Sequence, residues 1–356
     1  MRDDGPPDVR ETAIDLLRLS LGQRLRDPSI VDWDLLFAMS VAERCATLAW
    51  YRSGPAIREC APPRTVGTWR ALAMESDAVG RRQLQVLAEI IAVLRSAGTE
   101  PVVLKGLPLA SRLYGDSAVR SSVDIDIFVP LQQRTSAERA LLEMSWAVVE
   151  GESPWTQSLS RIIGGERFYL DVHSSLLDLN LRHLSAPGPA ACDVVLDAVR
   201  LPVHQDDLLP AYLAAHAAKH MPASLLYDID FHTLWGDLTC DQRAAASRQA
   251  DGVGLTGYLT WMIDRSKAVV AAAEGDRSAL ARLGIESRGR SAWHSVFRDV
   301  ALAPSPIAAV QAVAAWVWPP HLRGTPGPFA RRCVHRLHSS WSGYLRKRQG
   351  YRARHP

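Results

Sequence analysis

Apolar residues recur at helical spacing through the first hundred positions of the chain. Amphipathic segments cover residues 14–21, 33–52 and 69–96, with a proline pair at 62 and 63 before the last of them. In the third segment the apolar positions that share one helical face are Leu84, Leu87, Ile90, Ile91 and Leu94. This spacing is typical of helices that bury one side. We therefore predict a helical N-terminal region that Gly98 closes as a C-cap.

After Gly98 the period of the apolar pattern changes from about 3.6 to 2, which indicates entry into a sheet. Short apolar runs predict strands at residues 101–104, 123–129 and 146–150. Segments with helical spacing separate them, at 107–114 and 134–144. Alternating strands and helices of this kind predict a small mixed sheet.

A Gly164-Gly165 pair lies between two alternating runs, residues 157–163 and 167–173. Gly-Gly between such runs is a hairpin signal, because both turn positions accept positive φ angles. The hairpin adds two antiparallel strands to the predicted sheet.

Helical spacing returns after a Pro- and Gly-containing loop at 185–189 and dominates the rest of the chain. Its clearest segments are residues 208–220, 225–238, 255–273 and 307–318. The predicted fold class is thus α+β. A small mixed sheet core at 99–180 is flanked by an N-terminal helical region at 1–98 and a C-terminal helical region at 181–356.

The composition is that of a soluble globular protein. Of the 356 residues, 47% are hydrophobic and 22% are charged, and the net charge of +3 favours no class of partner. Basic residues crowd positions 331–354. This basic tail is either a solvated chain end or a surface for an anionic partner.

The five cysteines are scattered, and no C-x-x-C pair occurs, which is typical of reduced thiols. The N-terminus lacks a basic segment followed by an apolar one, so no secretory signal is predicted. The apolar segment at 307–318 contains Gln311 and ends at a proline pair, short of a membrane-spanning length. We expect a cytoplasmic protein without a membrane partner.

Two aspartates share one face of the strand predicted at 123–129. Side chains alternate between faces along a strand, so the carboxylates of Asp124 and Asp126 point to the same side. Two like charges held together cost free energy unless a cation joins them. A divalent metal such as Mg²⁺ that carries substrate phosphates meets this need.

A third aspartate, Asp171, lies in the apolar strand predicted at 167–173. A carboxylate among apolar strand residues is disfavoured without a partner, and a shared metal provides one. Metal-assisted nucleotidyl transfer with two metal ions normally uses three carboxylates. The alternative is a solvated sheet face on which Arg120 pairs with the carboxylates. The coincidence of Asp171 with the aspartate pair and with Lys105-Gly106 favours the metal site.

Gly106 is predicted where a strand turns into a helix. A glycine there lets a ligand approach the backbone, and the free N–H groups of the following helix can bind an anion such as a triphosphate. Lys105 adds a positive charge at the same place. The G-x-x-x-x-G-K-[ST] pattern of a P-loop is absent. Arg120 either neutralises phosphate or pairs with the carboxylates.

Several histidines are candidates for the same site. His173 lies two positions after Asp171 and shares its face, as a substrate contact, a general base or a partner that orients Asp171. His216, Lys219 and His220 lie on one face of a helix, with structural, phosphate-binding and metal-binding roles all open. No H-E-x-x-H zinc motif includes them.

These residues form blocks that resemble a known family. They are Leu104-Lys105-Gly106, Leu113-Tyr114-Gly115-Asp116, Arg120, Asp124-Ile125-Asp126, Leu170-Asp171-Val172-His173, His216 to His220, Leu226-Tyr227-Asp228-Ile229 and Trp318-Pro319-Pro320. The chain is similar, over about residues 103–320, to the uncharacterised bacterial nucleotidyltransferase family. That family lies within the superfamily that has the DNA polymerase β-like palm. The Lys-Gly turn departs from the superfamily's Gly-Gly or Gly-Ser but leaves the three aspartates intact.

The resemblance implies Mg²⁺-dependent transfer of a nucleoside monophosphate from an NTP, with Asp124, Asp126 and Asp171 as the metal ligands of a two-metal site. We expect ATP as the donor. The expected nucleotide contacts are Lys105, Gly106, Arg120, His173, His216, Lys219 and His220. The resemblance does not identify the acceptor, which is a small molecule, a peptide or a protein.

Two other functions compete with this one. A catalytically inactive or antitoxin-like nucleotide-binding module would keep the palm but not depend on the aspartates. A polynucleotide-directed transferase is suggested by the basic tail, but no strip of interleaved basic and aromatic residues supports nucleic acid as a partner. The intact set of three aspartates favours the enzyme.

Overall fold

A seven-stranded mixed sheet forms the centre of the residues that the computed structural model describes, which are 9–120, 122, 124–149, 156–176, 189–220 and 224–284. The strand order is β3-β4-β5-β2-β1-β7-β6. The strands are β1 (Val102–Val103), β2 (Ile125–Phe128), β3 (Ala147–Val148), β4 (Thr156–Ile163), β5 (Glu166–His173), β6 (Ala191–Leu196) and β7 (Val199–His204). The α+β class with flanking helices is therefore confirmed.

The central strands β2 and β5 run parallel to each other, which determines the geometry of the site. Their register pairs Asp126 with Asp171 and Phe128 with His173. Strand β1 is antiparallel to β2 and parallel to β7. Paired residues of neighbouring strands point to the same face of a sheet, so the acidic side chains of β2 and β5 share one face.

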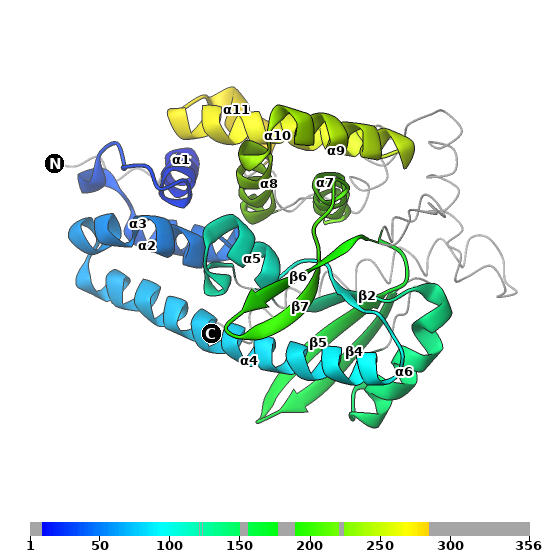
Figure 1. Ribbon diagram of the computed structural model, residues 1–356. Coiled ribbons are helices and arrows are strands. Elements are labelled where there is room, and N and C mark those ends of the chain that lie inside the picture. Colours follow the sequence, from blue (N-terminus) through cyan, green and yellow to red (C-terminus); the bar gives the residue numbers. More distant parts are fainter. Residues whose placement is uncertain are drawn as a thin grey trace, which may run out of the picture. The chain divides into compact units, whose positions relative to one another are not determined.

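The opposite face of the sheet packs on two helices. Ile125 and Ile127 of β2 and Leu170 of β5 lie in one buried apolar cluster with residues of α4 (Pro63–Ser96) and α6 (Arg134–Glu143). Figure 1 shows α4 running across the strands, with α6 beside β4. The apolar spacing of 84–94 is therefore explained, because that face of α4 covers the sheet.

Strands β6 and β7 form a hairpin that the sequence pattern did not predict. They pair antiparallel from Ala191 to Leu196, and β7 adds to the edge of β1 at Val103. The helical periodicity expected from residue 181 thus does not extend to 191–204. The sheet is larger than the one expected within residues 99–180.

Helices precede the sheet as expected from the sequence. They are α1 (Val9–Ser20), α2 (Trp33–Ala42), α3 (Ala46–Cys60) and α4, with a 3-10 turn η1 at Pro28–Ile30. Within the sheet region lie α5 (Leu107–Tyr114), α6 and the 3-10 turns η2 (Ser117–Val119) and η3 (Leu131–Gln133). Helix α1 also packs against two helices that follow the sheet, α10 (Thr256–Glu274) and α11 (Arg277–Leu283).

The helices that follow the sheet are α7 (Leu209–Lys219), α8 (Leu225–Asp237), α9 (Cys240–Gly252), α10 (Thr256–Glu274) and α11 (Arg277–Leu283). Inside this region Arg265 of α10 binds both carboxylate oxygens of buried Asp228, with Nε–Oδ1 2.6 Å and Nη2–Oδ2 2.7 Å. This buried ion pair joins α8 to α10.

The segment predicted as a helix at 307–318 and the basic tail at 331–354 lie outside the described residues. So do residues 150–155 and the loop at 185–188. None of the helices in the described part of the chain combines the length and the apolar character that crossing a membrane requires.

Candidate active site

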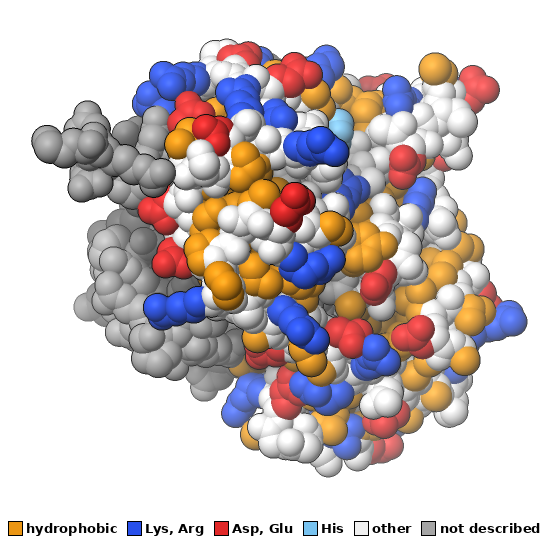
Figure 2. All heavy atoms as spheres, turned by 90° about the vertical axis from the view of Figure 1, so that its left-hand side faces the viewer, with side chains coloured by type: hydrophobic (Ala, Val, Ile, Leu, Met, Phe, Trp, Pro, Cys, Tyr) orange, Lys and Arg blue, Asp and Glu red, His pale blue; other side chains and the backbone are white. Residues whose placement is uncertain are grey.

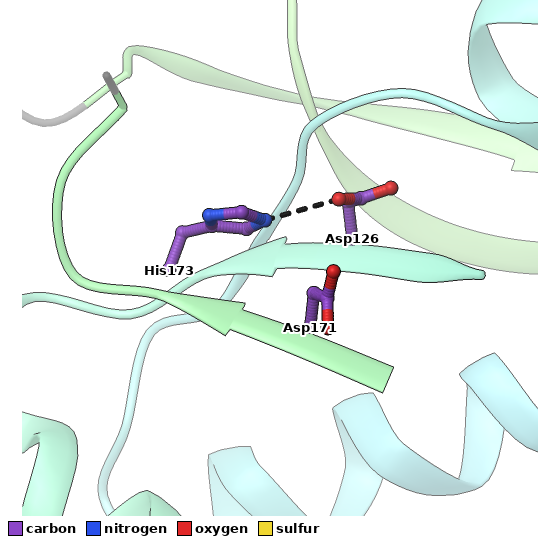
Figure 3. A group of neighbouring side chains, drawn as sticks. All are labelled: Asp126, Asp171 and His173. Carbon is purple, nitrogen blue, oxygen red and sulfur yellow. Dashed lines mark hydrogen bonds and ion pairs between the residues drawn. The ribbon is translucent and has the colours of Figure 1, made fainter. Parts of the chain in front are cut away.

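Asp126, Asp171 and His173 converge on the face of the sheet opposite the apolar cluster. One potential ligand atom from each lies within 4.8 Å of the other two. Figure 3 shows the ring of His173 directed at the carboxylate of Asp126, with Asp171 beside them. The β2–β5 register produces this group, because it pairs Asp126 with Asp171 and places His173 one side-chain repeat further along.

His173 is hydrogen-bonded through both ring nitrogens. Nε2 lies 3.0 Å from Oδ1 of Asp126, and Nδ1 lies 3.1 Å from Oγ1 of Thr156 in β4. A carboxylate can only accept, so Nε2 carries the proton that it donates to Asp126. The contacts hold the Asp126 carboxylate in a fixed orientation, the arrangement often found around metal-ligating groups.

Lys105 supplies the positive charge of the site. Its Nζ lies 3.0 Å from Oδ2 of Asp126 and 2.9 Å from Nε2 of His216 in α7. Burial disfavours the charged form, but Asp126 and Asp124 outweigh it and raise the pKa of Lys105. Burial and the charge of Lys105 lower the pKa of His216 well below its usual value, so its neutral ring accepts a hydrogen bond from the ammonium. One cation therefore bridges the sheet and α7.

Asp126 is ionised in this environment. Its burial opposes ionisation, but the charge of Lys105 and the hydrogen bond from His173 prevail, and they lower the pKa of Asp126 below its ordinary range. The side chain is only 3% exposed. A buried carboxylate with two such partners is fixed in charge and in position.

Asp124 lies outside the group formed by Asp126, Asp171 and His173. It precedes β2 and is half-buried, and the Oγ of Ser122 donates to its backbone carbonyl at 2.7 Å. Burial and the neighbouring charge of Asp126 raise the pKa of Asp124, which Lys105 only partly offsets. Asp124 therefore bears the like-charge repulsion that the sequence predicted for the pair.

Asp171 is held by the neighbouring strand. The Oγ of Ser158 in β4 donates to its Oδ1 at 2.7 Å, and the residue is half-buried. The expectation that a carboxylate in β5 needs a partner is met within the described residues by this hydroxyl.

Gly106 has a φ of +78°, which an L-residue with a side chain rarely adopts, so glycine is required at this turn. It is the N-cap of α5 and makes no side-chain cap hydrogen bond. A Cβ at this position would lie 3.6 Å from Oγ of Ser122. The geometry agrees with the predicted strand-to-helix turn, and Gly106 itself is buried.

Arg120 is paired elsewhere. Its Nε donates to Oδ2 of Asp230 in α8 at 2.6 Å, and the hydroxyl of Tyr114 donates to Oδ1 of the same carboxylate at 2.6 Å. Arg120 is 4% exposed. The guanidinium of Arg120 is therefore not accessible to a phosphate, and its partner is Asp230 and not one of the three aspartates of the candidate site. The described contacts of Arg120 join the segment before β2 to α8.

His216 and His220 lie beside each other at the end of α7, with ring centroids 4.6 Å apart. His216 is linked to the acidic group through its contact with Lys105. His220 stacks on Tyr227 of α8 at 5.9 Å, and Lys219 is exposed in the last turn of α7.

Two residues near the site were not among the candidate site residues, although Tyr227 lies in one of the blocks that carry the resemblance. Tyr227 makes ring contacts with both histidines, and Arg44, at the turn between α2 and α3, donates from Nη1 to its hydroxyl at 3.2 Å. Arg44 lies in the predicted N-terminal helical region, and no motif marks it. Only the packing of that region against α8 reveals it.

The side chains present fit a divalent cation. Carboxylate oxygens are the ligands that Mg²⁺ prefers, and Asp126 and Asp171 offer them from adjacent strands with Asp124 one repeat away. The imidazole of His173 already uses both nitrogens, so it suits the role of orienting Asp126 better than that of a ligand. A buried lysine paired with Asp126 shows that this face already accommodates positive charge.

Acidic side chains on adjacent parallel strands, a glycine turn and a nearby lysine together make this face of the sheet a candidate cation site. Residues 29–262, more than half of the chain, match the model of the family described as uncharacterised nucleotidyltransferase. The chain belongs to this family of nucleotidyltransferases. The predicted resemblance and the assignment as an enzyme that transfers a nucleotidyl group are therefore confirmed, with the acceptor unspecified.

Solved structures with some similarity are also nucleotidyltransferases or resemble them. The antibiotic-resistance factor ANT(2'')-Ia in solution is 16% identical, with a TM-score of 0.32 over 59% of this chain and 100% of that one. Its crystal structure with adenylyl-2''-tobramycin is 15% identical, with a TM-score of 0.31 over 54% and 97%. An antigenic nucleotidyltransferase-like protein from Paracoccidioides brasiliensis is 12% identical, with a TM-score of 0.33 over 50% and 91%. No curated protein matches the chain, and the assignment rests on the family match.

Proposed function

We propose that the chain transfers a nucleoside monophosphate from an NTP, with ATP as the donor and Mg²⁺ as the metal, to a small-molecule, peptide or protein acceptor. The observation that carries this proposal is the β2–β5 register, which pairs Asp126 with Asp171 on the face of the sheet opposite the apolar cluster. Family membership supplies the reaction class.

The reaction balances as a substitution at the α-phosphorus of the NTP. The nucleophilic oxygen or nitrogen of the acceptor forms a bond to that phosphorus and gives up its proton, while the bond to the bridging oxygen breaks and pyrophosphate leaves. Bound Mg²⁺ supplies positive charge that stabilises the phosphate oxygens during this change. The chain's own residues bind and orient the reactants, which is the main source of rate in such transfers.

Each residue of the site has a distinct part in this proposal. Asp124, Asp126 and Asp171 hold the metal, and His173 keeps the carboxylate of Asp126 in orientation through its Nε2 hydrogen bond. Lys105 and the backbone at Gly106 bind phosphate oxygens, because an ammonium and free N–H groups both favour anions.

The decisive experiment measures transfer of labelled α-phosphate. The purified chain is incubated with Mg²⁺, a cell extract and each of the four NTPs in turn, and labelled products are separated. We expect label to enter an acceptor from one NTP, and to be lost with a chelator and with Asp171→Asn. Absence of NTP binding by the unaltered chain in the presence of Mg²⁺ would refute the proposal.

A catalytically inactive or antitoxin-like module is the second candidate, favoured by the partners that Asp126 has without a metal. Lys105 lies 3.0 Å from Oδ2 of this carboxylate, and His173 is hydrogen-bonded to its Oδ1. This candidate predicts that Asp124→Asn leaves the cellular phenotype of the chain unchanged, whereas the enzyme requires that the phenotype be lost.

Nucleic acid as a partner finds no support in the face that Figure 2 shows, where basic and acidic side chains are interspersed. RNA binding with a steep salt dependence would be the evidence needed to support nucleic acid as a partner.

A further inference from the structure

The turn between α2 and α3 is hydrogen-bonded to the first turn of α8, and it carries Arg44. The preceding residue, Glu43, is 3% exposed, and its Oε2 accepts a hydrogen bond from the backbone N–H of Leu225 at 2.9 Å. Leu225 is the first residue of α8, so Glu43 satisfies one of the free N–H groups of that helix. The backbone of Arg44 therefore has a defined position relative to α8.

Arg44 occupies a backbone position that normally belongs to glycine. Its φ is +61°, and α2 ends in a Schellman motif in which Cys45 N–H donates to Ser40 O at 2.8 Å and Arg44 N–H to Val41 O at 3.0 Å. A side chain in this left-handed conformation is strained, whereas glycine is not. Strain of this kind is kept where the side chain does something that glycine cannot do.

The guanidinium of Arg44 lies at one end of a continuous row of side chains that leads to the acidic site. Its Cζ is 5.8 Å from the centroid of the Tyr227 ring, and Nη1 donates to the Tyr227 hydroxyl. The Tyr227 ring lies 5.5 Å from that of His216. His216 in turn contacts Lys105, which pairs with Asp126. Figure 1 shows α2 and α3, which flank this turn, on the same side of the described chain as α5.

Arg44 is a second cation on the way to the site. Lys105 lies 3.0 Å from Oδ2 of Asp126, and Arg44 is linked to Lys105 through Tyr227 and His216. Two cations thus approach the acidic residues from different elements, Lys105 from the end of β1 and Arg44 from the N-terminal helices. An NTP carries its negative charge along a chain of phosphates, which needs cations at more than one point.

We infer that Arg44 binds the outer phosphates of the donor nucleotide, so that the N-terminal helices complete the NTP site. This inference rests on the proposed function. A planar guanidinium with several N–H donors matches phosphate oxygens and can bind two of them at once. Lys105, next to Asp126, is left for the phosphate nearest the metal-binding carboxylates.

The test compares binding of a nucleoside triphosphate with binding of its monophosphate. Nonhydrolysable α,β-methylene analogues of the four NTPs are titrated in the presence of Mg²⁺ by calorimetry, and the tightest one is used together with the matching monophosphate. The variants are Arg44→Gly, which relieves the backbone, and Arg44→Met, which keeps the length of the side chain. Urea unfolding of each variant accompanies the titrations.

We expect both variants to weaken binding of the triphosphate analogue at least tenfold and to change binding of the monophosphate less than twofold. The unfolding midpoint of Arg44→Gly stays the same or rises, because glycine accepts the positive φ. The matched control is Arg58→Ala, which removes another arginine that lies over an aromatic ring, with Cζ 5.3 Å from the centroid of Trp50. It should leave both ligands unaffected.

Unchanged triphosphate binding in both variants would overturn the role of Arg44, and so would equal weakening of triphosphate and monophosphate. An unchanged nucleotide affinity with a raised KM for the acceptor would assign Arg44 to the acceptor instead and also overturn it. If the unaltered chain binds no analogue, the proposed function itself fails, which is a different result from a variant that binds normally.

Discussion

Asp124 and Asp126 are two positions apart, yet their carboxyl groups have opposite electrostatic surroundings. Burial opposes the charge of Asp126, but Lys105 and His173 outweigh it and lower its pKa. For Asp124, burial and the charge of Asp126 act in the same direction and raise its pKa. Without a bound cation the charge of Asp124 is therefore a cost to the fold, and with one it becomes a ligand.

Asp124→Asn should separate activity from stability. Nucleotidyl transfer should fall at least about a hundredfold, because a neutral amide is a poor metal ligand. The free energy of unfolding without metal should stay the same or rise by up to about 1 kcal/mol, because repulsion from Asp126 is removed. Transfer assays and urea unfolding measure the two effects.

The control for this prediction is Asp264→Asn, in α10, whose side chain is 68% exposed and pairs only loosely with Lys267 at 3.5 Å. It should change neither quantity. A loss of stability in Asp124→Asn comparable with its loss of activity would show that Asp124 is a structural residue.

The sequence singled out Asp126, Asp171 and His173, which the structure brings together, but not the residues that pair with them. Alternation along a strand placed Asp124 and Asp126 on one face, and an isolated acid in an apolar strand singled out Asp171, because both follow from local backbone geometry. The pairing of Arg120 with Asp230 spans 110 positions. No local pattern encodes such a contact, and for the same reason Arg44 could not be found.

At the scale of elements, the two hairpins show which turns a sequence reveals. The turn between β4 and β5 contains Gly164 and Gly165, and glycine is the residue type that most readily adopts positive φ angles. The sequence therefore predicted the ends of this hairpin to within one residue. The turn between β6 and β7 uses Asp197 and Ala198 at φ values of 44° and 67°. Aspartate and alanine give a much weaker signal than glycine there, and Pro202 in β7 argues against a strand.

Helix α8 is connected to the sheet region by a buried polar network of Asp230, Arg120 and Tyr114, of which only Arg120 was expected to contact the nucleotide. Replacing Asp230 with alanine leaves Arg120 and the Tyr114 hydroxyl buried without their shared partner. We expect the free energy of unfolding to fall by about 3–5 kcal/mol, the usual cost of breaking a buried ion pair. Urea unfolding measures it.

Asp237→Ala is the matched control for Asp230→Ala, since Asp237 is an exposed residue at the end of the same helix. It should change stability by less than about 0.5 kcal/mol. If Asp230→Ala were equally mild, Arg120 would have a second partner and the role of this network in joining the elements would be wrong.

Asp15 in α1 makes the free energy of unfolding depend on pH. Burial and the nearby Glu11 raise its pKa to about 6, from 3.8 in the unfolded chain. A carboxyl group whose pKa is higher in the folded state destabilises the fold when it is ionised. The free energy of unfolding therefore gains from Asp15 as the pH falls from above 6 towards 4, because the group becomes protonated in the folded chain.

Asp15→Asn removes that ionisation. We expect the variant to be more stable than the unaltered chain by about 1 kcal/mol at pH 8, after allowing for solvent screening of a partly exposed group, and to lose this advantage near pH 4. Urea unfolding at the two pH values tests it. An equal gain at both values would mean that packing of the amide, not charge, is responsible.

At the scale of the whole molecule, the described helices before and after the sheet are not separate from each other. Nη1 of Arg18 in α1 donates to the carbonyl of Ala273 in α10 at 3.0 Å, and Arg277 in α11 pairs with Glu11 at 3.1 Å. Helix α1 packs on both of these later helices. The division into regions 1–98, 99–180 and 181–356 therefore describes sequence order and leaves open which parts fold alone.

The fragment 99–180 tests that division. It lacks β6 and β7, which pair with β1, and it lacks α4, whose Leu84, Leu87, Ile90, Ile91 and Leu94 fill the apolar cluster beneath the sheet. Burying five such side chains contributes on the order of 10 kcal/mol, which is comparable with the whole stability of a typical domain, about 5–15 kcal/mol.

We therefore expect the fragment 99–180 to show no cooperative urea transition, whereas a fragment of residues 63–204 should show one. The longer fragment contains α4, α6 and all seven strands of the described sheet, and with them every residue of the apolar cluster. Circular dichroism during urea titration, with the full chain as reference, distinguishes the two. Cooperative unfolding of 99–180 would show that the region from β1 to β5 folds by itself and that neither α4 nor the β6–β7 hairpin is needed for its stability.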